Sequence, residues 1–198
     1  MQIADSWAVK YVEPAFNGNP DEAFSLAAAL GNAKGGAVAV AMRTARVPRP
    51  AFRAFLDAAW SQDHAWVIDA AGTRRRLAAM FRYAAFSLPD FVDDSVPVWR
   101  GTAGVSVRVA RAGYSWTLNR DTACWFAMRF SDLRPRPLVP CAEVPRGEIA
   151  LYGNERGEAE VVLLRVPAAS VDGTPDEWQR RFEVVEVARR VADRPQSK

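Results

Sequence analysis

The chain has 198 residues, of which 49% are hydrophobic and 25% charged, a composition typical of a folded protein with one or two hydrophobic cores. It contains one histidine and two cysteines, which is too few for a four-cysteine or mixed cysteine–histidine metal centre. The 26 basic and 23 acidic residues leave a net charge of +3, which permits a nucleic-acid partner without requiring one.

The N-terminal segment MQIADSWAVK lacks the basic region, apolar core and cleavage site of a secretory signal. The most apolar stretch, Leu26 to Met42, is interrupted by glycines and polar residues and is not expected to span a membrane. We therefore expect a cytoplasmic protein with reduced Cys124 and Cys141 and no membrane partner. His64 has no glycine-flanked nucleophile elbow beside it, so we interpret it as a structural residue.

The first part of the chain, residues 1–92, is predicted to be helical. Asn19, followed by Pro20 and two acidic residues, predicts a helix start, and Gly31 predicts its end. A second helix is predicted from Pro50 and a third after Thr73. Their apolar faces consist of Phe52, Phe55, Leu56, Ala59 and Trp60 in the second helix and Leu77, Met80, Phe81 and Ala84 in the third.

The second part, residues 93–198, follows a connection rich in proline and aspartate and contains short β-like runs. These runs are VPVWRG, PLVPCAEV, GEIALYG and EAEVVLLRV. A short helix over TACWFAMRF is expected, capped by Asn119 or Asp121, and a last helix is expected after Thr174. The predicted fold class is α+β, with a helical N-terminal region before a β-sheet region, and a single compact domain overall stays open as an alternative.

The chain has no glycine-rich dinucleotide fingerprint after a strand and no P-loop. Instead, three of its β-like segments carry polar residues where a plain strand would not. These residues are Arg100 in VWRGT, Ser115 and Thr117 in GYSWTLN, and Glu158 and Glu160 in GEAEVVLL. Taken singly, they are explained by an edge-strand arginine, a polar strand end and an exposed strand entry.

Taken in order, an Arg-Gly strand, an aromatic-Ser-x-Thr strand running into a helix, and Glu-x-Glu before a hydrophobic strand resemble the Arg-Ser-Glu class of mono-ADP-ribosyltransferases, the cholera-toxin-like group. The match covers about Val98 to Val166 and implies an ADP-ribosyltransferase-like mixed β-sheet core. The second motif is commonly Ser-Thr-Ser in that family, whereas this chain has Ser115, Trp116 and Thr117. Trp116 points away from its two neighbours in a strand, so we expect it in the core.

The resemblance implies NAD as a substrate and a role for each matched residue. Breaking the nicotinamide–ribose bond passes through an oxocarbenium-like sugar, which the carboxylate of Glu160 would stabilise. The guanidinium of Arg100 would hold the pyrophosphate, and Ser115 would orient the carboxylate or the ribose. The backbone of Gly101 would allow close approach of the nicotinamide amide, and Thr117 belongs to the same predicted NAD site.

The remaining candidates lie beside these motifs. Period-two alternation predicts that Glu158 and Glu160 share one face of a strand, so that Glu158 would take a proton from the acceptor. Tyr114 is an alternative between a ring stacked on NAD and a structural residue. Trp125 and Phe126 lie on the predicted short helix and are expected in the core.

The predicted function is therefore mono-ADP-ribosyl transfer from NAD to a protein side chain, with NAD hydrolysis as a side activity. In the family resembled, Glu-x-Glu favours an arginine acceptor, and such enzymes act as effectors, toxins or phage-encoded modifiers. One alternative is an inactive module of the same fold that docks a protein or nucleic acid. Another is a nucleic-acid-directed transferase, suggested by the arginines at positions 43, 46, 49, 53, 74, 75, 76 and 82.

Overall fold

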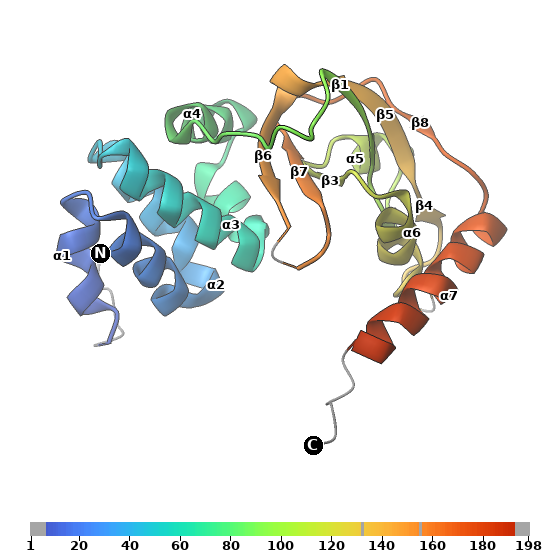
Figure 1. The fold of residues 1–198 in the computed structure, drawn as a ribbon, viewed down its shortest axis with the longest axis horizontal. Helices are drawn as coiled ribbons and strands as arrows, with labels where there is room; N and C mark the ends of the chain where they lie inside the picture. The colour runs from blue at the N-terminus through green and yellow to red at the C-terminus, as the bar shows by residue number, and fades with distance from the viewer. Residues whose placement is uncertain (1–6, 132, 155, 193–198) are drawn as a thin grey trace. The chain divides into compact units, whose positions relative to one another are not determined.

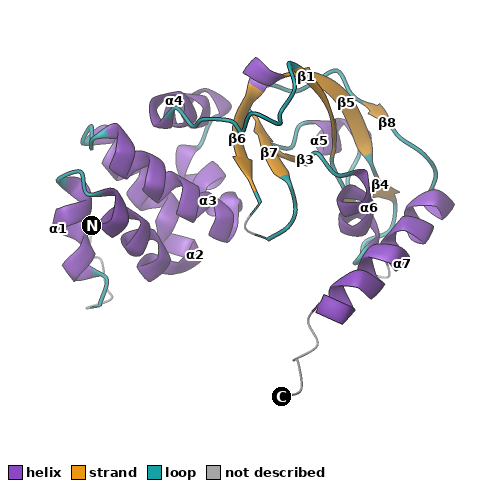
Figure 2. Cartoon of the chain, in the orientation of Figure 1, coloured by secondary structure: helices purple, strands orange, loops and turns teal. Residues whose placement is uncertain are grey.

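The structure is a computed structural model that describes residues 7–131, 133–154 and 156–192. The chain divides into two compact units, one up to Ser87 and one from Leu88 onward, where the sequence predicted a boundary between residues 92 and 93. We call them the helical unit and the sheet unit, since helices alone form the first and an antiparallel sheet with helices forms the second (Figures 1 and 2). The predicted α+β class with a helical N-terminal region is confirmed.

The described part of the helical unit contains α1 (Val9–Phe16), α2 (Pro20–Thr44), α3 (Arg49–Ala71) and α4 (Arg74–Ala84). Asn19 caps α2 as predicted, because its side-chain oxygen accepts from the backbone N–H groups of Asp21, at 3.0 Å, and Glu22, at 3.2 Å. Gly31 interrupts the helix with φ of 64°, but the chain resumes helical conformation beyond it. The predicted helix end is thus a kink.

The apolar stripes predicted for the second and third helices form the core of the helical unit. All nine predicted residues are buried, none more than 4% exposed. Two side chains close the ends of this core, since Arg53 donates to the carbonyl of Ala84 and Tyr83 donates to the carbonyl of Val47, both at 2.7 Å. His64 stacks on Trp60 with 5.2 Å between ring centroids, in keeping with a structural role.

The described part of the sheet unit contains a six-stranded sheet in the order β6-β7-β3-β1-β5-β8, with every pairing antiparallel, and a small pair of β2 with β4. The strands are β1 (Ser95–Trp99), β2 (Thr102–Ala103), β3 (Ser115–Thr117), β4 (Pro137–Leu138), β5 (Pro140–Pro145), β6 (Ile149–Gly153), β7 (Glu160–Leu163) and β8 (Ser170–Val171). The helices are α5 (Val107–Arg111), α6 (Arg120–Met128), α7 (Pro175–Ala192) and the 3-10 turn η1 (Arg146–Glu148).

The two faces of the central strands differ in character. One face carries the main core of the unit, in which Val98, Trp116 and Val161 pack together, so the predicted burial of Trp116 is confirmed. The adjacent residues point the other way, because side chains alternate along a strand. On that second face, register places Glu160 opposite Thr117, and Thr117 opposite Trp99.

Helices α6 and α7 form a smaller core of the unit, made of Ala123, Cys124, Ala127, Val139 and Trp178. Asn119 caps α6, accepting from the N–H groups of Asp121, at 2.8 Å, and Thr122, at 3.1 Å.

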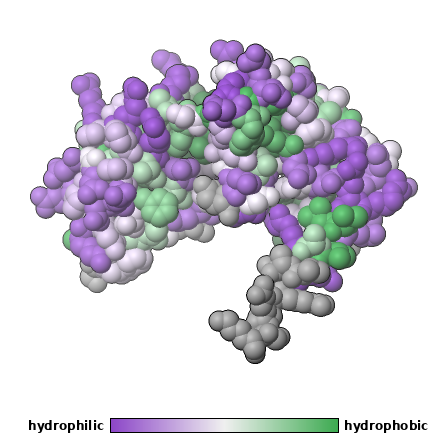
Figure 3. All heavy atoms as spheres, in the orientation of Figure 1, coloured by the Kyte–Doolittle hydropathy of each residue, from purple (hydrophilic) through white to green (hydrophobic). Residues whose placement is uncertain are grey.

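α7 begins after Thr174 as predicted and stays helical through its β-branched segment. Figure 3 shows an apolar patch on α7, which carries Val184 and Val187, exposed by 69% and 62%. Within the described residues, no helix combines the length and apolar character needed to cross a membrane.

Candidate active site

Three neighbouring strands bring the predicted site residues together. β7 pairs with β3, and β3 pairs with β1, so that Glu160, Thr117 and Trp99 lie in one row across the sheet. Arg100 follows Trp99 directly, and Ser115 shares the face of Thr117 two residues along β3. Glu160 is only 9% exposed. Residues up to 60 positions apart in the chain thus lie on or directly beside three neighbouring strands, and their convergence on one cleft stays a prediction.

Arg100 is held tightly at the end of β1. Its guanidinium donates a short hydrogen bond to the carbonyl of Ser115, and its backbone N–H donates to the carbonyl of Pro140 at 2.9 Å. The guanidinium also lies against Gly113, where a Cβ atom would overlap it. The sequence analysis did not identify Gly113, although its position just before the aromatic-Ser-x-Thr motif is a signal of close backbone packing.

The Arg100 guanidinium is a buried cation. Burial lowers the pKa of the Arg100 guanidinium, and the negative charge of Glu160 opposes that shift. The Nε atom is buried and has no hydrogen-bond partner among the described residues, which carries a free-energy cost. This atom lies against Gly113, and the pyrophosphate contact expected of Arg100 stays a prediction.

The two hydroxyl groups of β3 are used differently. Thr117 donates from its hydroxyl to the carbonyl of Glu158 at 2.6 Å and accepts from the N–H of Asn119 at 3.0 Å. Thr117 therefore holds the segment that precedes Glu160. The hydroxyl of Ser115, by contrast, makes no hydrogen bond within the part of the chain that the structure describes. It is the hydroxyl that has capacity for a ligand.

The placement of Glu158 departs from the predicted geometry. β7 begins at Glu160, and Ala159 has φ of 46°, in the left-handed region. The assumption of regular strand alternation from Glu158 to Glu160 is therefore wrong, because alternation requires extended backbone at the intervening residue. The Glu158 side chain is 14% exposed and pairs with Arg156 at 3.2 Å.

The glycine at position 101 has a packing explanation. A Cβ atom there would overlap the carbonyl oxygen of Ala123 in α6, so only glycine allows the helix to approach the end of β1. Its approach to a nicotinamide amide stays a prediction. Tyr114 is half-buried, and its carbonyl accepts from the N–H of Leu163 at 2.9 Å. That bond extends the pairing of β3 with β7 and leaves the predicted role of the ring untested.

The aromatic residues of α6 are less buried than predicted. Trp125 and Phe126 are only half-buried, because the helix turns its alanines and Cys124 toward the core. The Trp125 indole donates to a carboxylate oxygen of Glu186 at 2.9 Å. Arg129, which the sequence analysis did not identify, covers both rings, with its guanidinium carbon 4.8 and 4.5 Å from their centroids.

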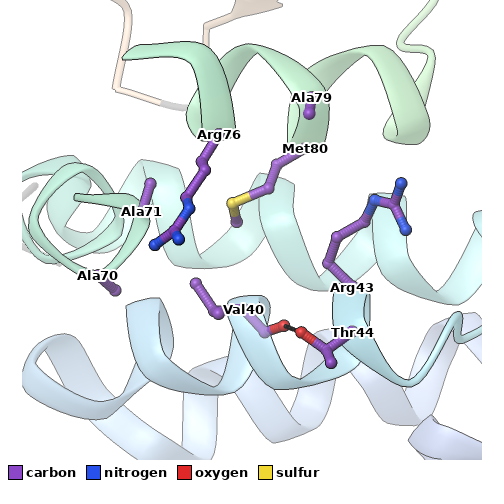
Figure 4. Close-up of a pocket in the computed structure, with 8 residues that line it drawn as sticks. All are labelled: Val40, Arg43, Thr44, Ala70, Ala71, Arg76, Ala79 and Met80. Carbon is purple, nitrogen blue, oxygen red and sulfur yellow. Dashed lines mark hydrogen bonds between the residues drawn. The ribbon is translucent and has the colours of Figure 1, made fainter. Parts of the chain in front are cut away.

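Neither of two cavities in the described residues is lined by Arg100, Ser115 or Glu160. One of about 420 Å³ borders Trp99 and Cys141, where Arg120 and Asp172 already pair with each other. The other, of about 440 Å³, lies in the helical unit between α2, α3 and α4 (Figure 4). Arg76 and Arg43 line it from different helices, and the hydrogen bond drawn there joins the Thr44 hydroxyl to the carbonyl of Val40. Of the three consecutive arginines at positions 74, 75 and 76, Arg76 thus lines a cavity.

Within the described residues, no three histidine, cysteine, aspartate or glutamate side chains form a group that could hold a metal ion. Cys124 is buried, and burial raises the pKa of its thiol to about 11, so it is protonated near neutral pH and is a poor nucleophile. Both cysteines are free of disulfides.

The chain was compared with protein families, with curated proteins and with solved structures. None of the three comparisons found a match.

Proposed function

We propose that this protein is an NAD-dependent mono-ADP-ribosyltransferase that acts on a macromolecule in the cytoplasm, with NAD hydrolysis as a side activity. One observation carries the proposal. The guanidinium of Arg100 donates to the Ser115 carbonyl on β3, and Glu160 lies on β7, the strand that pairs with β3. Three motifs that are unremarkable alone therefore form one polar group on the side of the sheet away from its main core.

The site residues divide the proposed chemistry. When NAD is bound, the bond from ribose C1′ to the nicotinamide nitrogen breaks and nicotinamide leaves with the electron pair. Glu160, nearly buried, offers a negative charge where the sugar becomes positive, and low solvent access strengthens that interaction. Arg100 supplies charge-assisted donors for the phosphates. The Ser115 hydroxyl orients the ribose or the Glu160 carboxylate.

The acceptor then supplies the new bond to C1′ and must lose a proton. Glu158 is the second carboxylate of the motif, and Thr117 fixes its backbone carbonyl. Its partner Arg156 is 51% exposed, so the ion pair is screened by solvent and can open. Glu158 is thus suited to receive the acceptor's proton at the rim of the site. An effector, toxin or phage role belongs to this proposal, and an arginine acceptor is what the family resemblance alone favours.

Glu160→Gln is the direct test. It keeps the size of the side chain and removes the charge, so we expect nicotinamide release from NAD to fall about a hundredfold to a thousandfold with little change in NAD affinity. Glu143→Gln is the matched control, because Glu143 is exposed on β5 of the same sheet. Thermal melting of each variant checks folding. Wild-type turnover in Glu160→Gln would contradict the assignment and favour an inactive binding module.

Arg100→Ala separates binding from chemistry. It removes ground-state contacts with the phosphates, so NAD affinity should fall along with turnover. Arg165→Ala is the control, since Arg165 is 82% exposed and its ion pair with Glu148 spans 3.9 Å. Calorimetry of NAD binding is the measurement. Unchanged affinity in a folded Arg100→Ala protein would remove Arg100 from the NAD site.

A further inference from the structure

The C-terminal end of α6 carries a surface of aromatic rings and guanidinium groups that the proposed reaction does not use. The guanidinium carbon of Arg129 lies 4.8, 4.5 and 4.8 Å from the ring centroids of Trp125, Phe126 and Phe130. From α7, Arg189 lies 4.0 Å from the centroid of Trp125. We call these five residues the arginine–aromatic surface.

This surface remains open to solvent. Phe130 is 47% exposed and Arg129 is also exposed. Leu133, in the turn that follows, is 80% exposed. Burying such exposed apolar side chains against a partner is favourable. Because they lie beside planar guanidinium groups, we expect a partner that offers flat rings and negative charge.

Among the described residues, four arginines and Glu158 contribute to the charge around this surface. Burial lowers the pKa of Arg129, the positive charges of Arg189, Arg156 and Arg134 lower it further, and the negative charge of Glu158 opposes the shift. Glu158 is already paired with Arg156. Glu186 accepts from the Trp125 indole and from Arg190, at 2.9 and 3.0 Å. Within the described part of the chain, Arg129, Arg134 and Arg189 form no ion pair.

We propose that the arginine–aromatic surface binds single-stranded nucleic acid and presents it to Glu158 as the ADP-ribose acceptor. Phosphates neutralise unpaired arginines, and bases stack on aromatic rings and guanidinium planes. An arginine side chain of a protein is cationic and would be repelled by this cluster. An acidic protein would meet the charge but leave the exposed ring of Phe130 without a planar partner.

This inference rests on the proposed function for its chemical step. The bond from C1′ to nicotinamide breaks with its electron pair on nicotinamide, and a nitrogen or oxygen lone pair of the nucleic acid forms the new bond to C1′. The nucleophile's proton passes to the Glu158 carboxylate and then to solvent. Arg156 releases that carboxylate as it turns to a phosphate of the strand.

Binding is tested first and without NAD. The probes are fluorescein-labelled single-stranded RNA and DNA 12-mers of mixed sequence, read by anisotropy with the full chain between 50 and 200 mM salt. We expect affinity that falls with salt, and Arg129→Gln should weaken it about tenfold and lower the salt slope by about 0.7. Phe130→Ala should also weaken binding about tenfold, although it changes no charge.

Matched controls locate the effect. Arg165→Gln removes an exposed arginine of the sheet unit away from the cluster, and Arg75→Gln removes an exposed arginine of the helical unit. Both should bind like the parent. If neither oligonucleotide binds, or if Arg129→Gln and Phe130→Ala bind like these controls, the inference is overturned, and nicotinamide release remains a separate test of the proposed function.

Transfer is tested second, with NAD labelled in its adenine and the 12-mers or casein as acceptors. We expect label on an oligonucleotide, lost in Arg129→Gln while nicotinamide release without acceptor is unchanged. Label on casein and none on either oligonucleotide overturns the acceptor assignment. Absence of nicotinamide release in every sample overturns the proposed function itself, and with it the acceptor role.

Discussion

The helical unit and the sheet unit bury different kinds of side chain. Every buried residue described in the helical unit is apolar, whereas Thr117, Thr122 and Glu160 are buried in the sheet unit. Burial also shifts the pKa values of Arg100 and Cys124, both in the sheet unit. Burying a polar or charged group costs free energy unless it is bonded. Among the described residues, the sheet unit therefore buries polar side chains whose burial costs stability, while in the helical unit the buried Nε of Arg43 lacks a hydrogen-bond partner.

Both units contain glycines at which a Cβ atom would overlap a neighbour, but the neighbours differ. In the sheet unit, Gly101 and Gly113 exclude a side chain where α6 and the Arg100 guanidinium pass. In the helical unit, a Cβ at Gly36 would overlap the backbone carbonyl of Trp66 in α3, whereas Gly31 kinks a helix and has no neighbour that a Cβ would meet. Substitutions in the two units should therefore differ in whether they change stability alone or stability together with nicotinamide release.

The largest expected effect is on stability in the helical unit. Phe55→Ala removes a fully buried ring and should lower the free energy of unfolding by about 3–5 kcal/mol. Nicotinamide release per folded molecule should be unchanged well below the melting temperature. Chemical denaturation and a turnover assay on the same preparation measure both. A fall in turnover at temperatures where the variant is folded would break the distinction between the units.

A pH-dependent effect should appear in the sheet unit. The Cys124 thiol has a pKa of about 11 in the folded protein against 9.0 ordinarily, so unfolding favours loss of its proton. The free energy of unfolding is therefore unaffected by ionisation of Cys124 below pH 9 and falls by about 2–3 kcal/mol as the pH rises from 9 to 11. Denaturation at pH 8 and 11 should show a smaller decline in Cys124→Ala than in Cys141→Ala. Equal declines would contradict the assignment to Cys124.

Gly113→Ala should disturb Arg100 without altering Arg100 itself. The added methyl group overlaps the guanidinium, so we expect a stability loss of about 1–3 kcal/mol together with weaker NAD binding. Gly147→Ala is the matched control, because a Cβ there meets nothing within 4 Å. Calorimetric NAD titration of both variants is the measurement. Parent-like affinity in a destabilised Gly113→Ala protein would show that the position of Arg100 does not matter for NAD.

The smallest effects come from two helix caps of the same geometry. Asn19 and Asn119 each accept from the N–H groups two and three residues on, so Asn19→Ala and Asn119→Ala should each cost about 1 kcal/mol. Only Asn119→Ala should also slow nicotinamide release, because losing the cap loosens the start of α6, directly beside the Asn119 N–H that bonds the Thr117 hydroxyl and the Glu158 carbonyl that this hydroxyl holds. Thermal melts and turnover assays compare them. Equal turnover would place α6 outside the site.

Sequence alone determined several helix starts and apolar stripes in the two units. Helix starts at Asn19, Thr73, Asn119 and Thr174 were predictable, because a capping side chain and its two or three following residues suffice to define them. The apolar stripe of α3 was equally visible in its spacing. The identities of Arg100, Ser115 and Glu160 were also visible as an ordered pattern.

Tertiary structure decided which of these residues meet and how. The row from Glu160 through Thr117 to Trp99 depends on strand order, and pairing between distant segments is not encoded in local spacing. Ala159 has a left-handed backbone conformation just before β7, where Thr117 bonds the Glu158 carbonyl. The side chains of Glu158 and Glu160 therefore do not alternate as they would in a regular strand. Packing of α6 against Gly101, and of Arg100 against Gly113, likewise required the folded backbone. Close approach between segments far apart in the chain is a property of their final packing, which residue types restrict but do not specify.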